Sequence, residues 1–506
     1  MGEISDRFNS MFRLHSLSLV GHPILGNIHL DFCRDCYIGQ EVYTSVVIGA
    51  NGIGKSYFLR ALAEIFCCLE ALKEGKEPTV PRYYFSLHYT SYWKKFEFAN
   101  FREVNPVGQT QRRYTNFVFK RDGEGVEARE LLLPKKVIAS TTTLTDKFVA
   151  KSTDMYRYKG LRNENSPSTT GTRTMVRKTV ESLLNSLDEK YGFRVELRKL
   201  LEDLQLQPRL DLAYNLRYKE VFVKEGMTSG ELIYIFEHQK GMFKRETDIW
   251  GTKNFKTIRE KEPWKLDEAA ELLSRLARRG FGSGRQLLKY ELLEDDPKVG
   301  KDREGLKVLT SLDLLSYPTL KVYKSNDEYT FDQSSSGESS LLCQMVGIMS
   351  DIELNSLVLI DEPENSAHPN WQISYIGWLK KIFNQYPSCH FVISTHSHFM
   401  LTDLEPESSD IVALEKKDGV VRDVSEGVNT FNWSVDDILY RVFHVRNTRN
   451  YVLESRVLEL YRMVSGRSDD KQKMDVLIRE LSQYQMNNED PLLKLLETAK
   501  SYVESI

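Results

Sequence analysis

A glycine-rich loop near the start of the chain restricts the fold more than any other feature of the sequence. It follows a short apolar run, residues 44–48, that has the composition of a buried strand. Residues 57–66, after the loop, place their apolar side chains at helical spacing. The candidate phosphate-binding residues are Gly49, Asn51, Gly52, Gly54, Lys55 and Ser56. A strand, such a loop and a helix in this order predict a phosphate-binding loop (P-loop) in an α/β fold.

The chemistry of this loop follows from its residue types. Glycines leave the backbone free of side chains, so its N–H groups can converge on phosphate oxygens at the start of the helix. Lys55 would reach the β- and γ-phosphates as a point charge, and the Ser56 hydroxyl would bind Mg²⁺. The predicted cofactors are therefore ATP and Mg²⁺. Kinases, GTPases, transporter engines and DNA-repair clamps all use such a loop, so other motifs must decide the class.

Composition excludes several kinds of protein. The chain has 506 residues, enough for roughly two to four domains. Its formal net charge is −3, which does not support nucleic-acid binding by bulk charge. No apolar stretch is long enough to span a bilayer, and the first ten residues lack a signal-peptide core. We therefore expect a cytoplasmic protein without membrane contacts.

The cysteines do not form a recognisable metal or disulfide pattern. The chain has 6 of them, and only Cys33 and Cys36 have CxxC spacing. One such pair cannot complete a tetrahedral zinc site, and no matching pair follows. We expect two reduced thiols near a turn.

Changes in pattern along the chain suggest four regions. Aromatic and basic residues mix between 81 and 119, which indicates a half-buried sheet more than a base-stacking surface. Helical periodicity appears at 176–192, 194–205 and 264–280, without a long heptad array or an internal repeat. The predicted regions are an N-terminal half-domain with the P-loop (1–150), a mostly helical insert (151–325), a second half-domain (326–420) and a helical C-terminal region (421–506).

The second half-domain contains two further candidate parts of a phosphate site. "DQSSSGESS" is a serine-rich turn before an amphipathic helix, and its Ser335 and Gly337 could face an anion at the helix N-terminus, although an ordinary capped helix has the same pattern. "SLVLIDEPE" is an apolar strand followed by Asp361 and Glu362. Acids at the carboxyl end of such a strand lie where open α/β sheets bind ligands. Asp361 could hold Mg²⁺ through water, and Glu362 could deprotonate an attacking water.

A third stretch, "CHFVISTHSH", is another buried strand with His396 after its end. A histidine at this position can hydrogen-bond a γ-phosphate or the water beside it. By itself the residue would more often be structural, so the order of all the motifs carries more weight than His396 alone.

The order P-loop, "SSSGES", "LVLIDEPE" and "ISTHSH" resembles the ABC-type ATPases of the RecF/SMC/OLD branch, which place a large lobe between P-loop and signature. The stretches "KKVIASTTTLTDKF", "YRYKGLRNENSPSTTG" and "NTFNWSVDDILYRVFHVRNTRN" are similar to PtuA, the ATPase family of Septu and retron-associated antiphage systems. The resemblance implies an ABC-type head, a mixed sheet with flanking helices, plus a helical insert and a helical tail.

The resemblance also implies roles for the matching residues. Lys55, Glu362 and His396 would be catalytic, and Ser56 with Asp361 would hold the metal. Ser335 and Gly337 would form a signature that reaches the ATP bound by a second subunit. Two departures affect these roles. The family's Q-loop glutamine is missing from "ASTTTLTD", so that Ser140, Thr141 or another residue must substitute, or hydrolysis is slow. The signature reads SSSGES in place of LSGGQ or LSGGE, and Ala367 replaces the leucine common before the HP of the D-loop, and both changes alter the face toward the second subunit.

Several functions are compatible with this machinery. The resemblance favours an antiphage ATPase that oligomerises and controls a partner nuclease, of the HNH type if the chain acts like PtuA, with a retron reverse transcriptase and its RNA–DNA product as further candidate partners. The alternatives are a DNA-repair ATPase acting directly on DNA and a scaffold that binds ATP with negligible turnover.

Candidate basic points for DNA are Lys94, Lys95, Arg112, Arg113 and residues 275–285, which could equally be solvated faces. The C-terminal helices are the candidate docking surface. Their lack of spaced acids, with Asp436 and Asp437 at a helix start, argues against an internal nuclease.

Overall fold

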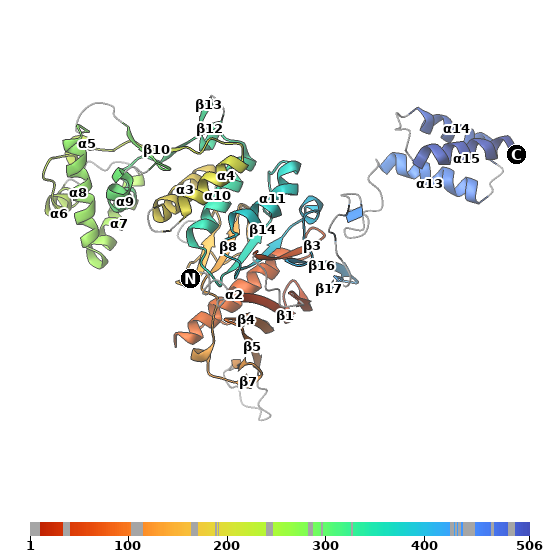
Figure 1. Cartoon of the computed structure of the whole chain (residues 1–506), viewed down its shortest axis with the longest axis horizontal. Coiled ribbons are helices and arrows are strands. Elements are labelled where there is room, and N and C mark those ends of the chain that lie inside the picture. The colour runs from red at the N-terminus through yellow and green to blue at the C-terminus, as the bar shows by residue number, and fades with distance from the viewer. Residues whose placement is uncertain are drawn as a thin grey trace. The chain divides into compact units, whose positions relative to one another are not determined.

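The computed structural model divides the chain into two compact units, residues 1–433 and 434–506, each with contacts mainly inside itself (Figure 1). The described residues are 11–33, 41–102, 115–162, 171–187, 190, 192–238, 246–281, 287–294, 297–324, 327–425, 430, 433, 437–438, 451–466, 470–483 and 491–505. Cys36, Arg112, Arg113, Arg285 and Asp436 therefore lie outside the described residues.

A seven-stranded sheet carries the motifs singled out in the sequence. Its spatial order is β17 (Val420–Asp423), β16 (Ser409–Lys417), β3 (Tyr43–Gly49), β15 (His390–Ser394), β14 (Leu357–Asp361), β8 (Val137–Thr141) and β9 (Tyr156–Lys159). Neighbouring strands are parallel except for β16 and β17. Every residue of β8, β14 and β15 is buried, as expected for strands covered on both faces. The predicted mixed sheet with flanking helices is confirmed.

A second sheet and the P-loop helix share one hydrophobic core with this sheet. The second sheet is antiparallel, in the order β2 (Gly26–Asp31), β1 (Phe12–His22), β4 (Tyr84–Ser91), β5 (Lys94–Arg102), β6 (Thr115–Arg121) and β7 (Glu124–Gly125). Helix α2 (Lys55–Lys73) contributes its buried face to the shared core. The ring of Phe98 stacks on those of Phe117 and Phe119, with centroids 5.7 and 5.4 Å apart. The aromatic-rich stretch thus packs as a sheet.

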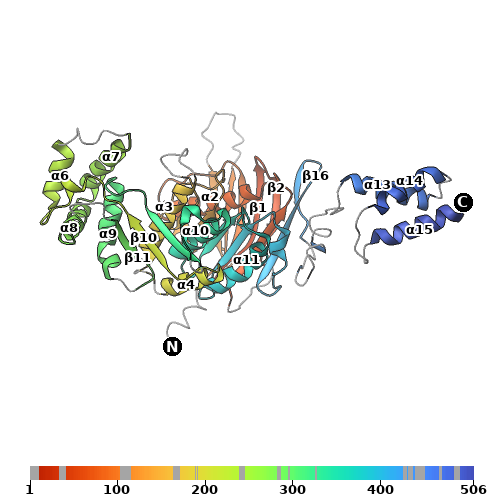
Figure 2. The same ribbon diagram turned by 90° about the horizontal axis from the view of Figure 1, so that it is seen from above.

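Other helices pack around α10 (Ser336–Asp351) and α11 (Pro369–Ile382). The ring of Phe383, at the end of α11, lies 5.3 Å from that of Phe391 on β15, so this helix lies against the sheet. Helices α3 (Thr172–Ser186) and α4 (Phe193–Asp203) contact α10, and α4 also contacts α11, as Figure 2 shows from above.

The region after α4 contains a small sheet as well as helices. The helices are α5 (Lys219–Phe222), α6 (Ser229–His238), α7 (Glu246–Lys261), α8 (Trp264–Arg278) and α9 (Pro297–Ser311). An antiparallel sheet adds β11 (Leu288–Glu291), β10 (Leu210–Tyr214), β12 (Thr319–Lys324) and β13 (Asp327–Thr330), in this spatial order. The insert was predicted to be mostly helical, and this sheet was not predicted. Most of its short strands pair with partners far away in the chain, which local periodicity cannot register.

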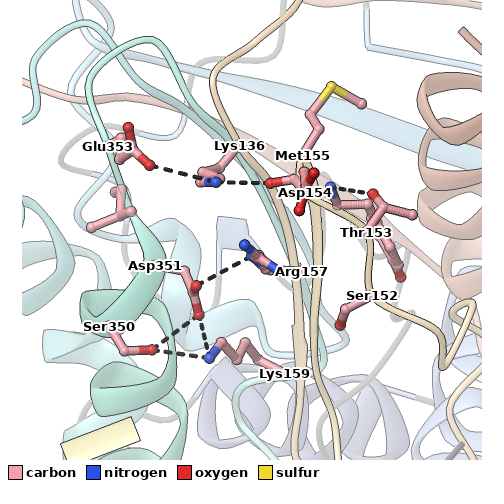
Figure 3. A network of polar contacts seen from close by, with 12 residues as sticks. Lys136, Ser152, Thr153, Asp154, Met155, Arg157, Lys159, Ser350, Asp351 and Glu353 are labelled. Carbon is pink, nitrogen blue, oxygen red and sulfur yellow. Dashed lines mark hydrogen bonds and ion pairs between the residues drawn. The ribbon is translucent and has the colours of Figure 1, made fainter. Parts of the chain in front are cut away.

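One segment ties together the C-terminal ends of two helices that begin at predicted functional motifs. Near the end of α2, the Glu70 carboxylate accepts hydrogen bonds from the Thr153 hydroxyl (2.5 Å) and the Met155 N–H (2.8 Å). Asp351, the last residue of α10, forms ion pairs with Lys159 and, at 3.4 Å, with Arg157 on β9 (Figure 3). The segment that contains β9 therefore fixes the C-terminal ends of α2 and α10 to the same edge of the seven-stranded sheet.

The smaller unit is helical. It contains α13 (Tyr451–Ser465), α14 (Lys471–Ser482) and α15 (Pro491–Ser505), whose apolar faces form a separate core. Within the described part of this unit, the helical tail that the resemblance implies is confirmed. None of the helices that the structure describes combines the length and apolar character needed to cross a membrane.

No disulfide joins the described cysteines, Cys33, Cys67, Cys68, Cys343 and Cys389. Cys33 and Cys68 are buried, and burial raises the pKa of Cys68 to about 12, so that this thiol stays protonated at neutral pH.

Candidate functional site

The P-loop has the geometry that its glycines predict. Strand β3 ends at Gly49 and α2 begins at Lys55. Gly54 has φ of 113°, a conformation that other residues rarely adopt. A Cβ atom on Gly49 would lie 2.7 Å from the carbonyl oxygen of Leu414, which is backbone and cannot give way easily. Asn51 and Gly52 are exposed at the tip of the loop. The loop backbone is thus open at its tip and closely packed at its base.

Lys55 is nearly buried beneath this loop, with 3% of its surface exposed. Its Nζ donates a hydrogen bond to the Gly49 carbonyl at 2.9 Å and lies 2.9 Å from Nε2 of His396. Burial lowers the Lys55 pKa to about 8, although the carboxylates of Glu362, Glu364 and Asp361 oppose this shift. The ammonium group is therefore held in place by a carbonyl and has several carboxylates near it. This is the group that the sequence predicts to contact the β- and γ-phosphates.

Ser56 and Asp361, which the sequence predicts to hold a metal, lie next to each other. The Ser56 hydroxyl donates to Oδ1 of Asp361 at 3.0 Å, and the Ser394 hydroxyl donates to the same oxygen. Burial raises the pKa of Asp361, and these two hydrogen bonds oppose the shift.

The donor set fits Mg²⁺. A hydroxyl and a carboxylate are hard oxygen donors, and Mg²⁺ is usually held by one or two protein groups together with phosphates and water. Within the described part of the chain, no cluster of three or more His, Cys, Asp or Glu side chains could hold a metal by itself. Ser56 and Asp361 are two such protein groups and would hold Mg²⁺ together with the phosphates of a bound nucleotide.

Glu362 and His396 face each other beside the lysine. Oε1 of Glu362 lies 3.2 Å from Nε2 of His396, and the hydrogen bond from this histidine lowers the Glu362 pKa although burial opposes it. Glu362 has φ of 48°, in the left-handed region, and its N–H donates to the Ser394 carbonyl at 3.0 Å. Non-glycine residues in this region cluster at functional sites. The Glu362 carboxylate and the His396 ring are thus held next to each other beside Lys55.

The position of the missing Q-loop glutamine is occupied by threonines. Thr141, the last residue of β8, is paired with Asp361 of β14, and alternation along a strand places it on the face that carries Val137 and Ala139. Ser140 points to the opposite face. Of the two candidate substitutes, Thr141 is therefore the one that shares a sheet face with Asp361.

The signature turn, which contains Ser335 and Gly337, lies against Ser366 and Ala367 of the D-loop in the same chain. Ser335 caps α10: its hydroxyl accepts the Glu338 N–H at 3.2 Å, while the Glu338 carboxylate accepts the Ser335 N–H at 3.3 Å. A Cβ atom on Gly337 would lie 2.5 Å from the carbonyl oxygen of Ser366. No hydrogen bond or ion pair between described residues joins Ser335 or Gly337 to the P-loop. Tertiary structure thus brings together five predicted residues, Lys55, Ser56, Asp361, Glu362 and His396, and leaves the signature outside this group.

Sequence reasoning missed one acid in this cluster. Glu364, the second glutamate of "DEPE", accepts the main-chain N–H of His396 through Oε1 at 2.5 Å. The repeated acid in the motif was the available signal, but only the fold shows which group it binds. The P-loop, the acids after β14 and the histidine after β15, on a mixed sheet with flanking helices, are the features of an ABC-type ATPase of the RecF/SMC/OLD type.

Comparisons with known proteins agree with this class. The family model that matches is described as "AAA domain, putative AbiEii toxin, Type IV TA system" and covers residues 231–401. Septu protein PtuA from Bacillus thuringiensis is 26% identical over 195 residues, which are 34% of this chain and 46% of that protein. "Retron Vc95 probable ATPase" from Vibrio cholerae serotype O1 biovar El Tor is 31% identical over 104 residues, 18% of this chain and 20% of that protein. The chain thus spans less than half the length of these curated relatives.

Solved structures of SMC heads are also among the matches. The SMC head domain from Thermotoga maritima has a TM-score of 0.34 and 13% identity, with 82% of this chain and 100% of that chain covered. The Smc head domain from Pyrococcus furiosus has a TM-score of 0.33 and 12% identity, with 86% and 100% covered. The sequence matches fit an ABC-type ATPase that is similar to PtuA.

Proposed function

We propose that the chain hydrolyses ATP with Mg²⁺, pairs with a second copy through shared ATP, and controls a partner nuclease in antiphage defence. The convergence of Lys55, Ser56, Asp361, Glu362 and His396 is the observation that carries this proposal. These residues follow three separate strands, β3, β14 and β15, so their meeting depends on the order of these strands in the sheet.

The site supports in-line attack of water on the γ-phosphorus. The water oxygen forms the new P–O bond, the bond to the bridging oxygen of ADP breaks, and Glu362 accepts the proton of the water. Lys55 and His396, whose nitrogens lie 2.9 Å apart, would bind the γ-phosphate oxygens. Mg²⁺, held by Ser56 and Asp361, would neutralise charge that develops on the phosphates.

Two features support pairing of heads. Ser335 is exposed at the start of α10, and Gly337 packs on Ser366, so the signature and the D-loop lie next to each other on one head. Because the signature makes no hydrogen bond or ion pair to the P-loop of its own chain among the described residues, a nucleotide in a second copy is its proposed ligand.

The Glu362→Gln variant tests this pairing. It loses the proton acceptor but keeps the shape of the site, so it should bind ATP and accumulate as a dimer. Light scattering after size exclusion, with ATP and Mg²⁺, would show the doubled mass. The same variant with Lys55→Ala should stay monomeric. A Glu362→Gln chain that stays monomeric at saturating ATP contradicts the pairing.

Control of a nuclease rests on the similarity to PtuA and on the separate C-terminal unit. Residues 434–506 have their own core and expose Leu458, Tyr461 and Val476, which makes this unit our proposed docking surface. The full chain should copurify with a nuclease encoded beside it, of the HNH type if the chain acts as PtuA does. Removal of the C-terminal unit should abolish copurification but leave ATP binding intact. A retron reverse transcriptase with its RNA–DNA product is the other candidate partner.

Direct action on DNA has less support from the structure. The buried Asp302 carboxylate accepts hydrogen bonds from Arg275 Nε (3.1 Å) and Arg279 Nη1 (2.7 Å), so two of the candidate DNA-binding arginines are used within the fold. Nζ of Lys94 lies 3.6 Å from Oδ2 of Asp122, so this lysine also has an ion-pair partner within the fold. Salt-dependent DNA binding by the isolated chain would favour the repair alternative. Bound ATP without release of phosphate would favour the scaffold alternative.

A further inference from the structure

Two loops of the site are joined by side chains that the ATPase mechanism does not use. The first loop follows β14 and contains Glu362, Glu364 and Ala367, and the second follows β15 and contains His396 and Ser397. Whatever holds these loops together also sets where the His396 ring lies relative to a nucleotide.

Glu364 makes the first connection. Its Oε1 accepts the main-chain N–H of His396 at 2.5 Å, so it fixes the backbone from which the ring projects. The ring itself lies 2.9 Å from Lys55 Nζ and 3.2 Å from Glu362 Oε1. Glu364 thus contacts the backbone of His396, whereas Glu362 contacts its ring, so the two glutamates meet different parts of this residue.

Gln372 makes the second connection, from α11. Its Nε2 donates to the Ala367 carbonyl at 2.8 Å, and its Oε1 accepts the Ser397 hydroxyl at 2.6 Å. The carbonyl requires a donor, which fixes the orientation of the amide. Ala367 also lies against Gly337, whose added Cβ would be 3.3 Å from the Ala367 Cα. The signature turn, the D-loop and the loop that follows β15 are thus in continuous contact within one chain.

We propose that Glu364 and Gln372 are positioning residues that hold the His396 ring toward the γ-phosphate and link its position to the D-loop that packs on the signature. Glu364 acts as a hydrogen-bond acceptor and not through its charge. This inference rests on the proposed function, because it assigns the γ-phosphate contact to His396.

The chemistry of the acceptor gives a sharp comparison. Glu364→Gln retains an oxygen that can accept the His396 N–H, whereas Glu364→Ala has none. The measurement is the equilibrium affinity for a non-hydrolysable ATP analogue divided by that for ADP, both with Mg²⁺. Only the analogue carries a γ-phosphate. Glu364→Ala should therefore lower this ratio by about tenfold, because the hydrogen bond from His396 to the charged γ-phosphate is lost. Glu364→Gln should keep the ratio within about threefold of the wild-type value.

Controls separate positioning from folding. Glu407→Ala, a change at an exposed glutamate in the same unit, should leave the ratio unchanged. If Glu364→Ala does not fold, Gln372→Glu provides the second test. It keeps the size of the side chain but loses the donor to the Ala367 carbonyl, so it should lower the same ratio by about tenfold.

Three results would overturn the inference: equal damage by Glu364→Gln and Glu364→Ala, equal losses of affinity for ADP and the ATP analogue, or an unchanged ratio in Glu364→Ala or Gln372→Glu. A wild-type chain that binds the analogue no more tightly than ADP would instead overturn the proposed γ-phosphate contact, and the inference with it. A wild type that favours the analogue but whose variants do so equally leaves the proposed function intact and removes only the positioning role.

Discussion

The hydroxyl of Ser56 donates a hydrogen bond of 3.0 Å to the carboxylate of Asp361, although 305 positions separate the two residues in the chain. Ser56 lies in the first turn of the P-loop helix, and Asp361 is the last residue of β14. Strand β15 lies between β3 and β14 and contributes the Ser394 hydroxyl to the same carboxylate oxygen. The candidate metal site therefore depends on three strands in their correct order.

Replacement of Lys55 should abolish tight binding of ATP. Its Nζ is held by the Gly49 carbonyl and lies beside His396, where it would meet the phosphates. Lys55→Ala should lower the affinity for ATP by about a hundredfold, equivalent to about 3 kcal/mol for a hydrogen bond between charged groups. Titration calorimetry measures this, and Lys76→Ala, at an exposed lysine just after the same helix, is the control. A Lys55→Ala chain with near wild-type affinity would contradict the assigned role.

Two glycines of α10 should respond oppositely to alanine. A Cβ on Gly337 would lie 2.5 Å from the Ser366 carbonyl oxygen, so Gly337→Ala must displace the D-loop. This variant should lower the free energy of unfolding by about 1–3 kcal/mol. A Cβ on Gly347 would meet no atom closer than 3.6 Å, so Gly347→Ala should stabilise the helix by about 0.5–1 kcal/mol. Chemical denaturation of both variants is the test. Equal effects would show that the contact between signature and D-loop is not tightly packed.

Asp351 should matter for stability far from the nucleotide. Burial by itself would raise its pKa, but Lys159 and Arg157 lower the pKa overall. Asp351→Asn leaves these two cations without their partner and should cost about 1–3 kcal/mol at pH 7. Because the folded-state pKa lies below the unfolded value, the stabilisation is present above the unfolded pKa of about 3.9 and is lost as the pH falls through the folded value.

The difference in stability between the wild type and Asp351→Asn should therefore shrink at acid pH. Asp418→Asn, at an exposed turn residue with φ of 53°, is a matched control that should have little effect at any pH. A constant difference from pH 7 to pH 3 would show that the charge of Asp351 is not the source of the stabilisation.

His390 should make the larger unit sensitive to mild acid. It is fully buried on β15, where its Nδ1 accepts the Leu14 N–H at 3.0 Å and its Nε2 lies 2.8 Å from the Ser45 hydroxyl. Burial, with the charge of Arg13, lowers its pKa well below the usual value. The folded chain keeps His390 neutral, so stability is lost as the pH falls below the unfolded pKa of about 6.5, by up to about 1.4 kcal/mol per pH unit.

The variants for this test are His390→Gln and His29→Gln. His390→Gln should be less stable at pH 8 but should lose less stability between pH 6.5 and pH 5 than the wild type. His29→Gln, at an exposed histidine, should follow the wild-type curve. Parallel curves for the wild type and His390→Gln would contradict a neutral buried imidazole.

Local patterns were sufficient for the parts of the site that fold from neighbouring residues. The strand, loop and helix around the P-loop follow from an apolar run, from glycines and from helical spacing, all within a short stretch. The acids after β14 were predictable for the same reason, since an uninterrupted apolar run identifies a buried strand and places its end.

Pairings between distant segments were not predictable in this way. The sheet β11-β10-β12-β13 was missed because most of its strands are very short and their partners lie far away in the chain. The choice between Ser140 and Thr141 remained open until the register of β8 with β14 was known, because a shift of one residue would exchange their faces.

The sequence by itself determined that this chain contains a phosphate-binding loop, acids and a histidine at strand ends, and helices between them, because neighbouring residues set backbone conformation and burial pattern. Only the tertiary structure decided that Asp361 meets Ser56, that Glu364 binds the backbone of His396, and that Gly337 packs on the D-loop. These contacts depend on strand order and register, which are set by long-range packing across the whole sheet and leave no mark in any short stretch of sequence.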